Sequence, residues 1–288
     1  MIPADTRLLR VPRRVGDLST RRVGFVLACG VVALAVIMAI GAPLLAPFDP
    51  LAVNLRLINA APGTDGHLLG TDASGRDILS RLMHGAQTSL LGPLIAVLVA
   101  TALGITLGAL AAWRGGWIDQ VISRVIEFLF SFPGLLAAVF TVALFGPGFL
   151  APAIGIAIAY APAIARLTRT VILQERDKLY VKAELALGFR GIRVLTRSVM
   201  PNALPIVLSL SVLSFGYALI DLAALSYLGL GVQAPQPDWG VMLNESTSSM
   251  LQGAWWVMAA PAIVIILVVV SVNIIGEALL ARRQEVLR

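Results

Sequence analysis

Six long apolar stretches dominate this sequence and leave few folds open to it. Each is close to the roughly 20 residues that a helix needs to cross about 30 Å of hydrocarbon. They lie at residues 23–46, 89–113, 118–145, 150–167, 203–228 and 254–279. Only 13% of the residues are charged, about half the proportion that is usual in soluble domains. The sequence therefore predicts an all-α integral membrane protein with six transmembrane helices.

The first apolar stretch follows several arginines and has some features of a cleavable signal peptide. The apolar part of such a peptide is only about 7–15 residues long, which is shorter than this stretch. We therefore interpret it as an uncleaved anchor. Cys29, the only cysteine, lies within it and is expected to be a small buried side chain.

The distribution of positive charge predicts the orientation of the spans. With the N-terminus inside, 19 Lys/Arg fall in inner segments and 3 in outer segments. Because positive residues are concentrated on the cytoplasmic side of membrane proteins, both termini are predicted to be cytoplasmic. The same bias accounts for the net charge of +6 without a nucleic-acid partner.

This topology predicts one membrane domain, residues 23–279, between cytoplasmic ends at residues 1–22 and 280–288. Three connecting segments would lie outside the membrane: residues 47–88 and 229–253 on the outer side, and residues 168–202 in the cytoplasm.

The stretch SGRDILSRLMHG, residues 74–85, has the pattern of an amphipathic helix at the outer surface. Ser74 is placed to cap its N-terminus. Opposite charges recur at i,i+4 spacing in two pairs, Asp72 with Arg76 and Asp77 with Arg81. We interpret the helix as an elbow that leads into span two, with direct contact to a partner as the alternative.

Two features inside the spans predict how they pack. Span two has a small residue at every fourth position, which favours close contact with another helix: Ala100, Gly104, Gly108 and Ala112. In span three, Pro133 removes a backbone hydrogen bond and is predicted to kink the helix, either for packing or beside a pathway.

Asp221 is an acidic residue inside span five. Ionised in lipid it would cost about 3 kcal/mol or more, so we expect it to face the helix bundle or a wet cavity. A role in the translocation pathway and a structural hydrogen bond to a neighbouring helix are both compatible with its position.

A basic island interrupts the apolar sequence, with eight Lys/Arg between Arg166 and Arg197 that exclude it from the membrane. Its pattern predicts two short helices. The first would begin near Asp177 and end at Gly188 in the left-handed conformation, and the second would run from about residue 191 until Pro201 ends it.

The first of these helices would carry Tyr180, Ala183 and Leu187 along one face. The small cytoplasmic part of the chain is unable to cover such a stripe. This favours a docking surface for a cytoplasmic partner, with lipid headgroups as the alternative.

The sequence carries no recognisable catalytic or metal-binding set. Neither of its lysines belongs to a phosphate-binding loop, and HExxH and GxSxG are absent. His67 and His84 lack neighbouring cysteines or clustered carboxylates and are expected to be solvated. These features indicate a transport subunit driven by another protein, not an enzyme.

Four motifs, in order along the chain, resemble the permease subunits of bacterial ABC importers. In the island, YVKAELALG followed by MPNALP resembles the EAA loop of that family. The other motifs are HLLGTDASGRDILSRLMHGAQTSL, FSFPGLLAAV and SYLGLGVQAPQPDWGVML. Together they resemble the second permease of the dipeptide/oligopeptide branch, which implies a type I ABC importer permease fold.

The resemblance implies that residues 168–202 are a coupling loop whose helix sits in a groove of an ATP-binding subunit. The residues that match the coupling motif are Tyr180, Val181, Lys182, Ala183, Glu184, Leu187, Gly188, Arg190 and Pro201. Two departures stand out. Relatives usually have Ala and then Arg where this chain has Glu184 and Leu185, and their acid in span five usually lies next to the position of Asp221.

The resemblance also implies the partners and the location. We expect a second, homologous permease, two ATP-binding subunits that bind ATP and Mg, and an extracytoplasmic solute-binding protein, all at a bacterial plasma membrane. This chain would hold no cofactor itself. The implied solutes are di- and oligopeptides, with nickel, glutathione or another small solute as the alternatives, and Pro133 and Asp221 are the candidate pathway residues.

Two other classes remain open at this point. A secondary transporter would need coupling ionisable groups inside its spans and paired broken helices in two repeats, of which the sequence offers one acid and no clear repeat. A membrane scaffold or regulator is also compatible with the sequence. Co-purification of an ATPase with this chain would separate the importer from both.

Overall fold

The computed structural model describes residues 17–286, with side chains for residues 22–281. The predicted cytoplasmic ends, residues 1–22 and 280–288, lie mostly outside that part. Every regular element within it is a helix, and five helices are long and apolar enough to cross a membrane: α1 (Asp17–Leu45), α2 (Ile78–Arg114), α5 (Leu150–Arg176), α8 (Met200–Tyr227) and α10 (Trp255–Val286). The predicted helical membrane fold is confirmed.

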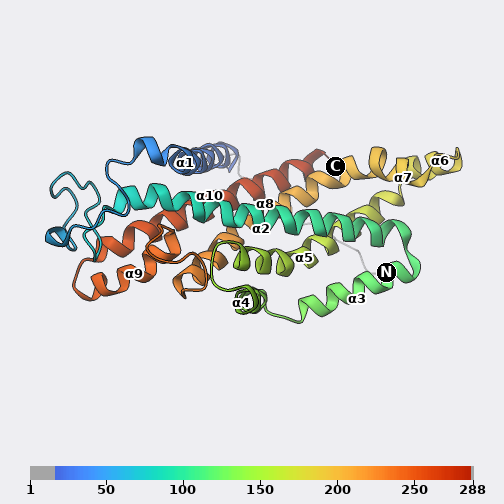
Figure 1. Ribbon diagram of the computed structural model, residues 1–288. Helices are drawn as coiled ribbons and strands as arrows, with labels where there is room; N and C mark the ends of the chain where they lie inside the picture. The colour runs from blue at the N-terminus through green and yellow to red at the C-terminus, as the bar shows by residue number, and fades with distance from the viewer. Residues whose placement is uncertain (1–16, 287–288) are drawn as a thin grey trace, which may run out of the picture.

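Four of these helices, α2, α5, α8 and α10, run lengthwise beside one another (Figure 1), whereas α1 is seen nearly end-on. α2 is central and packs against α1, α5 and α8. Shorter elements fill the connections: η1 (Leu55–Leu57), α6 (Leu179–Ala186), α7 (Gly191–Val194), the π-helical turn η2 (Leu195–Val199) and α9 (Trp239–Leu251).

The most extensive helix contact joins α2 to α5, and the small residues of α2 make it possible. A methyl group on Gly104 would lie 2.7 Å from the Cβ of Ile164. A methyl group on Gly108 would lie 2.7 Å from the Cβ of Thr168 and overlap the carbonyl oxygen of Ala165. The predicted role of the small-residue stripe in helix packing is confirmed.

The predicted third span is a broken helix, not a kinked one. It consists of α3 (Gly116–Phe130) and α4 (Gly134–Phe145), which meet at 87°. Pro133 stands before the first turn of α4, where its missing N–H removes no helical hydrogen bond. On the N-terminal side of the break, α3 is attached to α5: the guanidinium of Arg169 donates two 2.6 Å hydrogen bonds to the carboxylate of Asp119.

The predicted surface helix at residues 74–85 is instead largely the first two turns of α2. Its cap is Asp77, whose carboxylate accepts a hydrogen bond from the N–H of Ser80, so the prediction of Ser74 is wrong. Ile78 and Leu82 are buried, partly beneath Trp239 of α9. The helix is therefore covered by protein, which a sequence pattern with one apolar face does not reveal.

Two other predictions for this segment need correction. His67 is buried, not solvated, and its Nδ1 lies 2.9 Å from a carboxylate oxygen of Asp77. Asp77 is therefore occupied by His67 and Ser80 and does not pair with Arg81. The pair between Asp72 and Arg76 is confirmed, with 2.7 Å between carboxylate oxygen and Nε.

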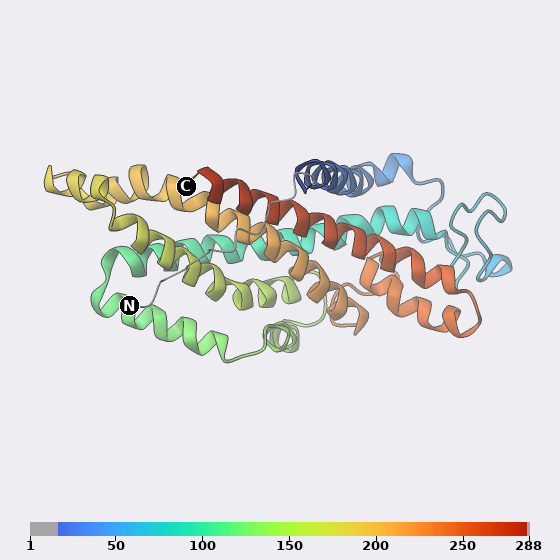
Figure 2. The same cartoon turned by 180° about the vertical axis from the view of Figure 1, so that it is seen from behind.

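Two of the predicted connecting segments on the outer side contain helix. The helix α2 already begins inside the segment 47–88, and α9 lies inside the segment 229–253. Within the predicted cytoplasmic segment 168–202, residues 177–199 connect α5 to α8, and we call them the hairpin. At the opposite end of the bundle, residues 46–82 and α9 form what we call the cap (Figures 1 and 2).

Pro201 does not end a helix as predicted. The π-helical turn η2 runs directly into α8, and Pro201 lies in the first turn of α8. A π turn leaves room for the proline ring, whose clash with the carbonyl group four residues earlier would break a regular α-helix. The hairpin is thus joined to α8 by uninterrupted helix.

Candidate functional site

The hairpin projects beyond the ends of the other helices, with α6 at its tip (Figures 1 and 2). It is anchored from within by an apolar cluster in which Val181, Val194 and Val199 pack with Trp113 of α2 and Ile172 of α5. Val181 is 0% exposed. Of the residues that match the coupling motif, Val181 therefore supports the hairpin from within and does not line its surface.

A polar network joins the two halves of the hairpin to each other and to the adjoining ends of α5 and α8. The hydroxyl of Tyr180 donates to the carboxylate of Glu175, and the side-chain amide of Asn202 donates to that hydroxyl over 3.0 Å. The hydroxyl of Ser198 bonds the carboxylate of Glu184 over 2.7 Å. Partial burial of the hydroxyl and its hydrogen bond to Glu175 raise the pKa of Tyr180 to about 12.

Gly188 ends α6 in the left-handed conformation that the sequence predicts, with φ of 84°. The N–H of Phe189 donates to the carbonyl of Glu184, and that of Gly188 donates to the carbonyl of Leu185. These two bonds form the Schellman motif, which needs a left-handed residue at the position of Gly188. Nothing lies within 4 Å of a Cβ built there, so the backbone conformation alone demands glycine.

The outward surface of the hairpin combines apolar and basic side chains. Leu187 is 77% exposed, and the predicted Ala183 is exposed beside it. Three arginines are exposed and form no ion pair with any described residue: Arg190, Arg193 and Arg197. Of the other predicted residues, Lys182 lies 3.5 Å from the carboxylate of Asp177.

A small hollow of about 160 Å³ opens on this surface, lined by Glu184, Phe189, Arg193, Val194, Arg197 and Ser198. The guanidinium of Arg193 lies 5.1 Å from the centre of the Phe189 ring. The sequence departure at Glu184 therefore places an acidic side chain at the edge of the basic surface, where Ser198 fixes its orientation.

The candidate pathway residues lie on either side of one stretch of α5. The hydroxyl of Tyr160 in α5 donates a 2.6 Å hydrogen bond to Asp221 in α8. A methyl group on Gly134, which follows Pro133, would lie 3.3 Å from the Cβ of Ala159. The expected hydrogen bond of Asp221 to a neighbouring helix is thus present, and Asp221 is only half-buried.

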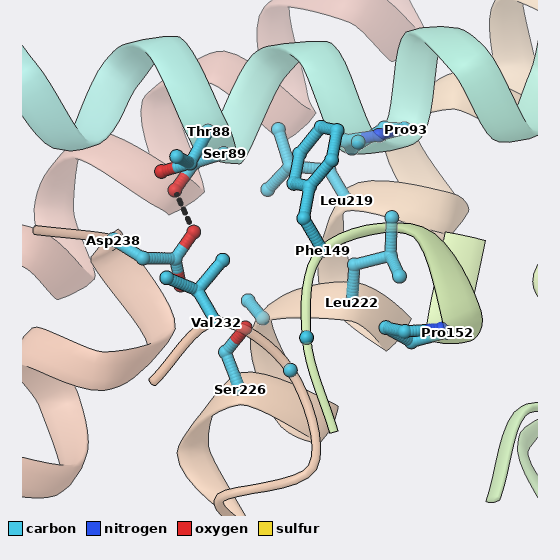
Figure 3. A pocket seen from close by; sticks show the side chains of 14 residues that line it. Thr88, Ser89, Pro93, Phe149, Pro152, Leu219, Leu222, Ser226, Val232 and Asp238 are labelled. Atoms are coloured by element: carbon cyan, nitrogen blue, oxygen red, sulfur yellow. Dashed lines mark hydrogen bonds between the residues drawn. The ribbon is translucent and has the colours of Figure 1, made fainter. Parts of the chain in front are cut away.

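Sequence reasoning missed a polar contact between α2 and the start of α9 (Figure 3). The hydroxyl of Ser89 in α2 donates a 2.8 Å hydrogen bond to the carboxylate of Asp238, the N-cap residue of α9. Phe149, Leu219 and Leu222 help to enclose a cavity of about 20 Å³, which is room for about one water. The PDWG motif that opens α9 was the available signal, since aspartate is a favoured helix cap.

The fold has solved counterparts. An inward-facing conformation of the MetNI methionine ABC transporter matches with a TM-score of 0.58 at 18% identity, covering 70% of this chain and 96% of that one. A second crystal form of the same transporter matches with a TM-score of 0.56 at 16% identity, covering 69% and 94%. These matches show the fold of a type I ABC importer permease.

Sequence relatives are much closer. Over 251 residues the chain is 40% identical to a di/tripeptide transport system permease protein of Pseudomonas aeruginosa, covering 85% of this chain and 82% of the relative. Over 222 residues it is 37% identical to a glutathione transport system permease protein of Pectobacterium atrosepticum, covering 77% and 73%. Residues 104–285 match the family described as the binding-protein-dependent transport system inner membrane component. The chain belongs to this family, the multi-pass inner-membrane permeases of ABC importers.

Proposed function

We propose that this chain forms half of the translocation pathway of an ATP-driven importer of di- and oligopeptides. A solute-binding protein delivers the peptide, and a second, homologous permease completes the pathway. Both termini lie in the cytoplasm of a bacterium, as the 19 to 3 distribution of Lys/Arg favours. The peptide cargo is supported by the 40% identity to a permease named for di- and tripeptides.

The hairpin is the contact to the ATP-binding subunit, and it is the single observation that carries this proposal. Its exposed Leu187, its open left-handed Gly188 and its unpaired arginines offer a surface for which the described residues provide no cover. Two such subunits bind ATP and Mg and hydrolyse the nucleotide, while this chain transmits their motion.

The second permease covers the exposed apolar faces of the bundle. An apolar groove of about 580 Å³ lies between α1, α2, α8 and α10 and is lined by residues such as Leu94, Leu98, Val212 and Val272. Helix faces of this kind are covered in a membrane either by lipid or by another helix. Membrane lipid fills what the second permease leaves open.

The test is uptake by cells that express the complete importer. Labelled dialanine should accumulate, and a catalytically inactive ATP-binding subunit should abolish the accumulation. Dialanine uptake that persists with the inactive subunit would instead indicate a secondary transporter. Failure of this chain to co-purify with any ATP-binding subunit would contradict the assignment of the hairpin.

Glutathione is the second candidate solute, because a relative at 37% identity is named for it. Glutathione is itself a modified tripeptide, so the two cargoes differ less than their names suggest. Competition decides between them: excess glutathione should leave dialanine uptake unchanged in a peptide importer and suppress it in a glutathione importer. Nickel uptake is measured in the same cells as the remaining alternative.

A further inference from the structure

Asp221 carries a carboxylate at membrane depth with most of its hydrogen-bonding capacity unused. Its Oδ2 accepts the hydroxyl hydrogen of Tyr160 over 2.6 Å. Oδ1 accepts no hydrogen bond from the part of the chain that the structure describes, and it is not enclosed. A carboxylate offers about four acceptor positions, so at least one oxygen is open to a further donor.

The surroundings of Asp221 differ on its two sides. Towards α5, Ala218 and Leu225 of the same helix belong to a buried apolar cluster. Away from α5, Tyr217 is 59% exposed and Ile220 is 46% exposed. Asp221 therefore lies at the edge between a dry core and an open face of α8, with Tyr217 one helical turn away.

This open face lies well inside the span. Asp221 precedes the last residue of α8 by six positions, which is about 9 Å along the helix. No lysine or arginine among residues 22–281 forms an ion pair with it. Since an unpaired carboxylate is costly in lipid, its open oxygen calls for water or a cation on that face.

We propose that the open oxygen of Asp221 receives the α-ammonium group of a peptide during its passage. This inference rests on the proposed function. Peptides carry that ammonium group near neutral pH, and tyrosine rings such as that of Tyr217 favour cations at their faces. Tyr160 holds the carboxylate and acts as a positioning residue. The second permease would supply the opposite wall of the passage.

Charge restoration in a cysteine-free parent tests this assignment. Cys29, the only cysteine, is first replaced by alanine, and Asp221→Cys is then made in the complete importer. The cells are treated with a methanethiosulfonate that adds either a sulfonate or a trimethylammonium group. Dialanine uptake should fall about tenfold to a hundredfold in Asp221→Cys, the range for a charge-assisted hydrogen bond. The sulfonate should recover most of it and the ammonium none.

Ile220→Cys is the matched control, because it lies on the same open face and carries no charge. Either reagent should there change uptake equally, through bulk alone. Asp221→Asn with wild-type uptake, an Asp221→Cys thiol that does not react, or a sulfonate no better than the ammonium would each overturn the assignment. If the importer with the unmodified chain does not accumulate dialanine, the proposed function itself fails.

Discussion

Arg81 in the cap and Arg197 in the hairpin are both arginines on helices, yet their surroundings are opposite. Arg81 is 1% exposed, and its guanidinium lies 2.6 Å from Glu245 and 3.5 Å from Asp72. Arg197 is exposed and pairs with no described carboxylate. The cap pairs its buried arginines with carboxylates of its own chain, whereas the hairpin leaves Arg190, Arg193 and Arg197 without an ion pair among the described residues.

The difference has an energetic basis. Removing one partner from a buried ion pair costs about 3–5 kcal/mol, because the other charge is left uncompensated. An exposed pair contributes only about 0–1 kcal/mol. Residues of the cap should therefore determine whether the protein folds. Residues of the hairpin should determine how the folded protein contacts its partners.

The largest effect is expected for Arg81→Ala in the cap. It leaves Glu245 and Asp72 with one cation, Arg76, and should cost about 3–5 kcal/mol in free energy of unfolding. Thermal unfolding of the purified complex measures the loss. Arg124→Ala is the matched control, since Arg124 forms a largely exposed pair with Glu127. Equal melting temperatures for the two variants would contradict the larger contribution of the buried ion pairs in the cap.

Between the two ends, Gly108→Ala should destabilise by about 1–3 kcal/mol through overpacking of α2 against α5. Gly30→Ala is its control, because nothing lies within 4 Å of a Cβ at that position of α1. It should be neutral or slightly stabilising, as helix propensity predicts. If both variants have the same melting temperature, the close contact between α2 and α5 is not important for stability.

Gly188→Val tests the hairpin side of the comparison between hairpin and cap. A valine in the left-handed region costs about 1–3 kcal/mol locally, and relief of that strain would redirect α6. We expect near-normal amounts of protein, but loss of peptide-stimulated ATP hydrolysis in the assembled complex. Gly253→Val is the matched control at the opposite end, since Gly253 has φ of 87° and equally open surroundings. Loss of stimulation in both variants, or in neither, would refute a specific role for the hairpin.

The smallest effect is expected for Tyr180→Phe, which removes the hydrogen bonds of the hairpin to Glu175 and Asn202 at a cost of about 0.5–1.5 kcal/mol. The folded-state pKa of about 12 lies above the ordinary value of 10.0. The stabilisation is therefore complete below pH 10 and disappears as the pH rises through 12. Thermal unfolding at pH 7 and pH 9 should show the same difference from wild type, and a smaller difference at pH 9 would contradict the raised pKa.

Local features of the sequence predicted what depends on local physics. The apolar stretches gave the helices, the small residues of α2 gave its contact with α5, and Gly188 gave the end of α6. The errors at His67 and Arg81 arose because their partners are set by the packing of the cap. Glu245 lies 164 residues from Arg81, and no helical spacing connects them.

The two prolines were misread for a different reason. A proline in the sequence indicates that a helix is interrupted, but the size of the bend depends on how the neighbouring residues pack. At Pro133 the helix breaks by 87°, while at Pro201 it continues through a π turn. Which of the two occurs depends on whether tertiary packing stabilises the residues before the proline as helix. Val194 and Val199 are stabilised in this way, because they pack against α5.

The uninterrupted helix that follows the hairpin has a thermodynamic consequence. From Gly191 to Tyr227 it comprises 37 residues, about 55 Å of rod, with the hairpin at one end and Asp221 near the other. The helix is continuous between these two ends, so a displacement of one end can reach the other. If nucleotide binding changes the affinity for a peptide at the proposed Asp221 site, the peptide must change the affinity for nucleotide by the same factor. The importer would sense its cargo through the same helix that moves it.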